Sequence, residues 1–247
     1  MPEESILRLG HTLRNWWSEE VASNGRWRTW LRLAALLWQF ARESTPAQHR
    51  QRYGDVDFDW DFRVDTTAAT VGWRARLLGL FHSPYQPTDP ALFHEILASL
   101  KIDFREFTFI DIGSGKGRAL LLAANYPFRR ILGVELFPAL HRIALENIRK
   151  YRSDSQRCFA IEAICEDART FTFPSEATVL YLFNPLPEAG FVEMLRNLEG
   201  SLQQHPRSMF VLYHNPLLEP VVEGSGSLKK LAGTHQYSVF AAGGGLP

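Results

Sequence analysis

Short apolar runs alternate with amphipathic stretches from about residue 90 to residue 241. The apolar runs, rich in β-branched and aromatic residues, predict buried strands, and apolar residues spaced three or four positions apart predict helices. The predicted strands are 108–112, 131–136, 159–165, 178–183, 209–213 and 237–241. Helices are expected at 117–125, at 139–150 after Pro138, and around 191–202. This alternation predicts an α/β fold with a mostly parallel sheet, helices on both faces, and ligands at the carboxyl ends of the strands.

A helix start precedes this alternation, in the stretch PTDPALFHEILASL. Asp89 suits the N-cap position, and Pro90 suits the first helical position. Leu92, Ile96 and Leu100 then fall along one face. We therefore expect an amphipathic helix that begins at Pro90.

The first 50 residues are rich in tryptophan and arginine and lack strand-like runs. Five residues at helical spacing predict one or two helices here: Trp27, Trp30, Leu31, Ala34 and Trp38. Leu36 and Leu37 make this segment apolar on nearly all sides, which favours packing on the main domain. The alternative is a helix in a membrane interface, because Arg28, Arg32 and Arg42 accompany the aromatic residues.

The stretch YGDVDFDWDFRVDTT at 53–67 has no periodicity long enough to define an element. An ordered loop is expected, with an edge strand or turn where acidic residues alternate with Val56, Phe58 and Trp60. No metal is expected at the aspartates of 55–61. The expected organisation is a helical extension at 1–50, a connecting or lid segment at 51–87, and one domain at 88–247.

Composition narrows the partners and the compartment. Lys+Arg and Asp+Glu each total 27, so nucleic acid is not favoured as a partner. Cys158 and Cys165 lie seven residues apart in one extended apolar run, about 23 Å from each other at ~3.3 Å per residue, which is too far for a disulfide. No basic leader is expected from the acidic start MPEE, which favours the cytoplasm. The most apolar stretch, 33–41, is shorter than the ~20 residues of a membrane span, which leaves only peripheral membrane contact.

The stretch FIDIGSGKGR places a glycine-rich turn between strand 108–112 and helix 117–125. Such a turn directs backbone N–H groups and a positive helix end at a ligand, and glycine allows the ligand to approach closely. A P-loop would need Ser or Thr after Lys116, where Gly117 stands, and a dinucleotide fingerprint would need glycine in place of Arg118. The spacing present is acidic-x-Gly-x-Gly-x-Gly.

This spacing resembles motif I of the Rossmann-like, class I S-adenosylmethionine-dependent methyltransferases. Glu135, at the end of the second predicted strand, matches the acid that holds both ribose hydroxyls in that family. Asp167 and the backbone of Ala168 match the adenine position, and Asn184-Pro185 falls at motif IV. Over roughly residues 85–240 the resemblance implies a seven-stranded sheet with S-adenosyl-L-methionine as cofactor. It implies these cofactor-binding residues: Asp111, Gly113, Ser114, Gly115, Gly117, Glu135, Asp167, Ala168, Asn184, Tyr85 and Thr88.

A finer similarity links the stretches YQPTDP and DIGSGKGR to the non-SET lysine methyltransferases. In those proteins a tyrosine-containing segment upstream of motif I closes over the cofactor, and Tyr85, Pro87 and Thr88 occupy that place here. The segment from FRVDT to YHNP is also similar to bacterial methyltransferase-domain proteins whose substrates are not established. The resemblance implies methyl transfer by in-line displacement, with the acceptor a nitrogen of a protein lysine or a small amine.

Asn184, Tyr85 and His214 are the catalytic candidates. Asn184 stands where amino-methyltransferases carry Asp/Asn-Pro-Pro-aromatic, although Leu186 and Pro187 replace the second proline and the aromatic residue, which disfavours a flipped nucleobase. His214, after strand 209–213, is a candidate for accepting the proton or orienting the substrate, or else a structural histidine bonded to a loop carbonyl. The alternative function is a non-catalytic S-adenosylmethionine-binding module that acts through partners.

Overall fold

The computed structural model describes residues 17–18, 21–22, 25–35, 56–67 and 87–243. The chain divides into two compact units, Met1–Val56 with Thr67–Gln86 and Asp57–Thr66 with Pro87–Pro247. In the first unit, residues 25–35 form a helix, as expected; Leu36, Leu37, Trp38 and Arg42 lie outside the described residues. None of the helices in the described ranges is long and apolar enough to cross a membrane.

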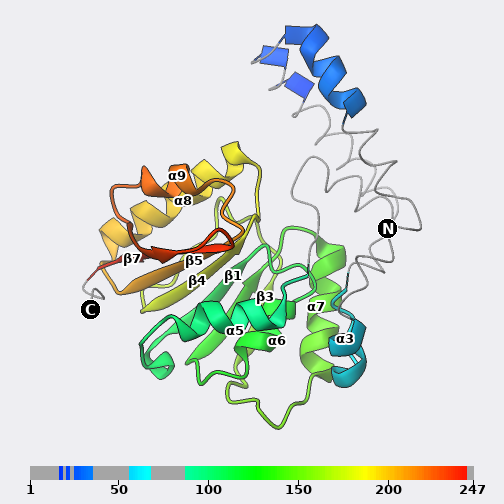
Figure 1. Ribbon diagram of the computed structural model, residues 1–247, viewed down its shortest axis with the longest axis vertical. Coiled ribbons are helices and arrows are strands. Elements are labelled where there is room, and N and C mark those ends of the chain that lie inside the picture. Colours follow the sequence, from blue (N-terminus) through cyan, green and yellow to red (C-terminus); the bar gives the residue numbers. More distant parts are fainter. Residues whose placement is uncertain (1–16, 19–20, 23–24, 36–55, 68–86, 244–247) are drawn as a thin grey trace. The chain divides into compact units, whose positions relative to one another are not determined.

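The second unit is built on a sheet that has, among the described residues, seven strands in the order β3-β2-β1-β4-β5-β7-β6 (Figure 1). The strands β1 to β5 are parallel, and β7 is antiparallel to both β5 and β6. Because β1 to β5 run the same way, their carboxyl ends share one edge of the sheet. The strands are β1 (Thr108–Ile112), β2 (Arg130–Val134), β3 (Ile161–Ile164), β4 (Thr178–Phe183), β5 (Met209–His214), β6 (Lys229–Gly233) and β7 (Tyr237–Ala242).

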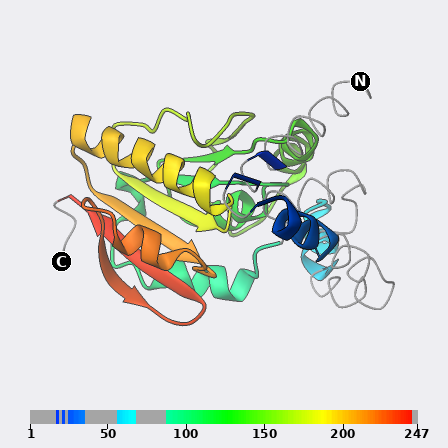
Figure 2. The same ribbon diagram turned by 90° about the horizontal axis from the view of Figure 1, so that it is seen from above.

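Helices cover both faces of this sheet (Figures 1 and 2). Successive strand residues point to opposite faces, so Phe109 packs in the core under α5 and α6, while Ile110 packs in the core under α8. The mostly parallel α/β sheet with helices on both faces is thereby confirmed. The helices are α3 (Val56–Phe62), α5 (Pro90–Ala98), the short 3₁₀ helix η2 (Phe104–Glu106), α6 (Arg118–Ala123), α7 (Pro138–Lys150), α8 (Glu188–Gln204) and α9 (Glu219–Glu223).

Several elements begin or end at the residues that the local sequence predicts. The Asp89 carboxylate accepts the N–H of Leu92 at 2.8 Å, and Pro90 opens α5, as predicted. The strands β1 and β4 have their predicted limits. β3 is shorter than the predicted strand 159–165 and ends before Cys165. Cys158 is buried, Cys165 is exposed, and both are free.

The prediction of a loop, edge strand or turn at the aspartate-rich stretch was wrong, because residues 56–62 form the helix α3. The alternation of acidic and apolar residues suggested a period of two, but Phe58 and Phe62 are also four positions apart and share a helix face. Their rings lie 4.8 Å apart, and Phe62 contacts Tyr151 at 5.1 Å. The third aromatic residue, Trp60, points outward with 82% of its surface exposed.

The strand β6 was missed by the sequence reading. All five of its residues are exposed, and the strand lies at the edge of the sheet with a register shift between Lys230 and Ala232. An exposed edge strand carries no alternation of buried and solvated positions, and lysine is common on such edges. β6 forms a hairpin with β7 through residues 234–236, and the pairing of β7 with β5 places this hairpin at the edge of the sheet.

Candidate functional site

The glycine turn lies between β1 and α6 at the carboxyl edge of the sheet. Gly113, Gly115 and Gly117 have φ angles of 76°, 55° and 85°, a backbone region that side chains disfavour. The N–H groups of Gly113 and Ser114 donate to the carbonyl of Val134 at 2.8 and 3.1 Å. These two bonds tie the turn to the end of β2.

Close packing also requires glycine at the first position of this turn. A Cβ atom on Gly113 would lie 2.9 Å from the Cβ of Pro185, which is shorter than carbon atoms tolerate. The glycine turn and the segment that follows β4 therefore touch. The buried Ser114 hydroxyl has no hydrogen-bond partner in the described part of the chain.

Glu135 directly follows β2, and its buried carboxylate is fixed by backbone donors. One oxygen, Oε2, accepts the N–H of Gly115 at 2.8 Å, and the other, Oε1, accepts the N–H of Phe137 at 2.7 Å. Burial raises the pKa of this carboxyl, and the backbone hydrogen bonds act in the opposite direction. The backbone N–H of Leu136 also acts on this carboxyl group, and the two oxygens together have lone pairs for four hydrogen bonds. Acceptor capacity therefore remains for a ligand hydroxyl.

Asp111 lies in β1 beside Glu135 and is 4% exposed. Burial, and then the neighbouring Glu135 carboxylate, raise the pKa of Asp111 to about 8. No hydrogen bond to its carboxyl group is found among the described residues. A buried acid at a strand end with a strongly raised pKa is typical of a functional site, since a cationic ligand would supply the missing counter-charge.

Asp167 follows β3, and its carboxylate forms a salt bridge with Arg169. The Arg169 Nε atom lies 3.0 Å from both carboxylate oxygens, and its Nη2 lies 2.6 Å from Oδ2. The backbone N–H of Arg169 adds a bond of 2.9 Å to Oδ1. The neighbouring Ala168 is buried. Binding of an adenine amino group by this carboxylate would therefore be shared with Arg169.

Asn184 stands immediately after β4, in the left-handed region with φ 44°. Its side-chain oxygen accepts a hydrogen bond of 3.1 Å from the hydroxyl of Tyr213, on the neighbouring strand β5. The same hydroxyl accepts the N–H of Leu218 at 3.2 Å, which fixes the phenol ring. The amide oxygen of Asn184 is thereby held in place and keeps one lone pair for a further donor.

His214 ends β5 and is buried in a polar chain. Its Nδ1 lies 2.6 Å from the hydroxyl of Tyr181, which in turn lies 3.5 Å from the hydroxyl of Thr88. The imidazole stacks on Phe183 with ring centroids 3.9 Å apart. Burial lowers the pKa of His214 to about 4, so the imidazole is neutral at pH 7. Tyr85, the third catalytic candidate, lies outside the described residues.

A second polar cluster, formed by Lys116, Asp65 and Asn147, stabilises the glycine turn. This cluster was not predicted from the sequence. The fully buried Lys116 ammonium lies 2.7 Å from the Asp65 carboxylate. Asn147 on α7 donates to the backbone carbonyls of both Asp65 and Lys116, at 2.8 and 2.9 Å, and accepts the N–H of Asp65 at 2.8 Å. The lysine within GSGKG was visible in the sequence, but no local pattern identifies partners 51 and 31 positions away.

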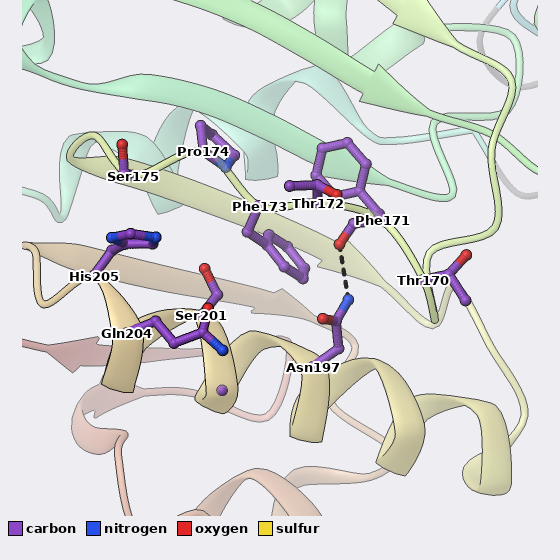
Figure 3. Close-up of a pocket in the computed structure, with 11 residues that line it drawn as sticks. Thr170, Phe171, Thr172, Phe173, Pro174, Ser175, Asn197, Ser201, Gln204 and His205 are labelled. Atoms are coloured by element: carbon purple, nitrogen blue, oxygen red, sulfur yellow. Dashed lines mark hydrogen bonds between the residues drawn. The ribbon is translucent and has the colours of Figure 1, made fainter.

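A cavity of about 530 Å³ lies elsewhere, between the segment 170–175 and the C-terminal half of α8 (Figure 3). Asn197 spans one side of it by donating to the carbonyl of Phe171 at 2.8 Å. Its lining segment 170–175 precedes β4, and α8 ends before β5 begins, so the cavity faces the amino ends of these strands. It is separate from the carboxyl edge described above.

Comparisons with known proteins find likeness in structure alone. No protein-family model matches the sequence, and no curated protein matches it. A structure titled as a predicted N6-adenine-specific DNA methylase from Listeria monocytogenes has 15% identity and a TM-score of 0.47, over 63% of this chain and 51% of that one. An RNA methyltransferase from Salinibacter ruber, solved with S-adenosyl-L-homocysteine, has 18% identity and a TM-score of 0.44, over 65% and 96%. The chain spans about half the length of the first of these.

The strand order β3-β2-β1-β4-β5-β7-β6 with an antiparallel β7 defines the fold class. The chain has the fold of the class I S-adenosylmethionine-dependent methyltransferases. At the carboxyl edge of this sheet, the chemistry of the residues suits that cofactor. Asp111 is a buried acid that a cationic group would stabilise in its ionised form. Glu135 has a carboxylate held by backbone N–H groups, and the glycines of the turn carry no side chains that would block a ligand.

Proposed function

We propose that the chain binds S-adenosyl-L-methionine at the carboxyl edge of β1 and β2 and transfers its methyl group to a nitrogen acceptor. The observation that carries this proposal is the pair of buried carboxyl groups, Asp111 and Glu135, on either side of the glycine turn. A structural role alone would not favour two acids at neighbouring strand ends, because burial penalises both charges.

Each of these groups has a task that its surroundings support. Glu135, held by two backbone N–H groups, would accept both ribose hydroxyls. Asp111 would bind the ammonium of the methionine end, directly or through water, and the cation would stabilise its carboxylate. When bound, the cofactor supplies a methyl group on a positively charged sulfur.

We place the acceptor end of the site at the carboxyl ends of β4 and β5. The Asn184 oxygen, oriented by Tyr213, would accept an N–H of the incoming amine and so direct the nitrogen lone pair. His214 is neutral at pH 7, and its ring is held by Tyr181 and Phe183. It would orient the acceptor rather than store its proton, because a pKa of about 4 makes a weak base. Tyr85 stays a candidate for closing the site.

Cofactor binding is tested by calorimetry with S-adenosylhomocysteine on purified protein. Asp111→Ala and Glu135→Ala should each weaken binding by about tenfold or more, because each removes a charged hydrogen-bond partner. Glu106→Ala is the matched control, since Glu106 is exposed near the amino end of β1. Unchanged affinity in both site variants would reject the placement of the cofactor.

Methyl transfer is tested with methyl-labelled S-adenosylmethionine and a desalted lysate of the source cell, with small molecules added back separately. Base-stable label in a protein band supports a lysine acceptor, and label in the small-molecule fraction supports a small amine. Asn184→Ala should bind cofactor and transfer little label, whereas Asn197→Ala, on α8 at the other cavity, should behave as wild type. Cofactor binding without any transfer would favour the non-catalytic binding module.

A further inference from the structure

The helix at residues 25–35 exposes large apolar side chains that neither the fold nor the proposed chemistry uses. Trp27 is 75% exposed, Trp30 57% and Leu31 56%. Trp17 is close to this group, with its ring centroid 5.1 Å from that of Trp30 in an edge-to-face arrangement. Exposed apolar side chains gathered on one helix commonly mark an interaction surface.

These side chains occupy one continuous face of the helix. At 3.6 residues per turn, Trp30, Ala34, Trp27, Leu31 and Ala35 span an arc of about 140°. All five are exposed. The face that is buried or half-buried lies on the other side and contains Thr29 and Leu33. The most apolar side of this helix is therefore turned outward within its own unit.

Basic residues border this apolar face. Around the circumference of the helix, Arg28 lies next to Ala35 at one border of the apolar face, and Arg26 lies next to Trp30 at the other border. Both arginines are exposed. The whole unit of Met1–Val56 and Thr67–Gln86 contains ten arginines and no lysine against six acidic residues, whereas the remainder of the chain has 17 basic and 21 acidic residues. Six of the seven tryptophans are in this unit. The neutral total charge of the chain thus conceals a basic, tryptophan-rich unit.

We propose that the outward face of helix 25–35, defined by Trp27, Trp30 and Leu31, binds the surface of an anionic phospholipid membrane. Indole rings favour the headgroup region of a bilayer, and arginines beside them pair with lipid phosphates. A protein partner would also cover an apolar face, but the basic charge on both borders favours an anionic surface that extends beyond the helix. This inference does not depend on the proposed enzymatic activity.

The test is co-sedimentation of the full chain with vesicles of phosphatidylcholine alone or with added phosphatidylglycerol. Wild type should bind the anionic vesicles and lose binding as salt is raised. Replacement of Arg26 and Arg28 by Gln should weaken the partition coefficient by about 25-fold, since each basic residue near an anionic surface contributes about fivefold. The double change Trp27→Ser and Trp30→Ser should weaken it by about tenfold or more per indole.

Two matched controls isolate the helix. Trp60→Ser removes an indole that is 82% exposed on α3, and Arg196→Gln removes an exposed arginine on α8; both should bind as wild type. Quenching of tryptophan emission by brominated lipid gives a readout on the unmodified protein. The proposal is overturned if wild type ignores anionic vesicles at low salt, or if the helix variants bind as wild type. It is also overturned if the helix variants lower the melting temperature without changing partition, since the face would then be packed against protein.

Discussion

The raised pKa of Asp111 predicts that cofactor affinity depends on pH. The carboxyl group has a pKa of about 8, because of burial and then the neighbouring Glu135, against an ordinary value of 3.8. In the free protein at pH 7 it is therefore protonated in roughly nine molecules of ten. A bound ammonium favours the carboxylate, so cofactor binding should release this proton.

The magnitude follows from the position of that pKa. Below pH 8, affinity should rise about tenfold for each pH unit, because binding requires the ionised form. Between pH 6 and pH 8 the gain should be roughly 50-fold, and above pH 8 it should level off. His214 does not interfere in this range, since its pKa of about 4 keeps it neutral throughout.

The assay is isothermal calorimetry with S-adenosylhomocysteine, which keeps the ammonium and transfers no methyl group. Titrations at pH 6 to 8.5 give the slope, and titrations at pH 7 in buffers of different ionisation enthalpy give the number of protons released. Wild type should release about one proton per site. Asp111→Asn should bind weakly, without the slope and without proton release.

A second variant separates Asp111 from its neighbour. Glu135→Gln should lower affinity at every pH but keep most of the slope, because the ribose hydroxyls do not carry the cation. Tight binding by wild type with no pH dependence would refute the reasoning. So would an Asp111→Asn variant that keeps both the slope and the proton release.

Three predictions concern stability, each measured by urea unfolding. Asp111→Asn should raise the free energy of unfolding by about 1–3 kcal/mol at pH 8 and by less as pH falls toward 4, since a raised folded-state pKa makes ionisation destabilising between these limits. Gly113→Ala should lower the free energy of unfolding by about 2–4 kcal/mol, because of the positive φ and the contact with Pro185. The control Gly200→Ala, which has open space around it in α8, should raise the free energy of unfolding by about 0.5–1 kcal/mol. Equal effects of the two changes would exclude backbone strain at the glycine turn. Asp65→Asn should cost about 3 kcal/mol and Lys116→Met less, because the ammonium is fully buried while the Asp65 side chain is 40% exposed and can be hydrated; the reverse order would refute this.

Much of the fold was accessible from local sequence signals. The glycine spacing after β1, the Asp89-Pro90 helix start and the buried apolar runs are each written in a few neighbouring residues. Two misreadings show the boundary of such signals. The α3 sequence fits periods of two and of four alike, and the helix is the form that packs Phe58 against Arg118 and Phe62 against Tyr151. The strand β6 is exposed throughout and exists because β7 offers it a partner.

Part of the candidate site was accessible in the same way. Glu135 and Asn184 could be placed from the sequence because parallel strands deliver their carboxyl ends to one edge, so a residue after a predicted strand has a predictable location. That both Asp111 and Glu135 are buried side by side, with the pKa of Asp111 raised to about 8, required the packed structure.

Apart from α3, β6 and the short helices η2 and α9, the sequence by itself determined the order of strands and helices in residues 90–242, the glycine turn and the acids near it, because each depends on residues close together in the chain. The tertiary structure alone decided which distant polar groups find partners: Tyr213 for Asn184, Tyr181 for His214, and Asp65 for Lys116. It also revealed that helix 25–35 turns its tryptophans outward. Hydrogen bonds and burial depend on which surfaces meet after folding. Periodicity along a chain predicts which face of a helix or strand is buried, but not which other element packs against that face.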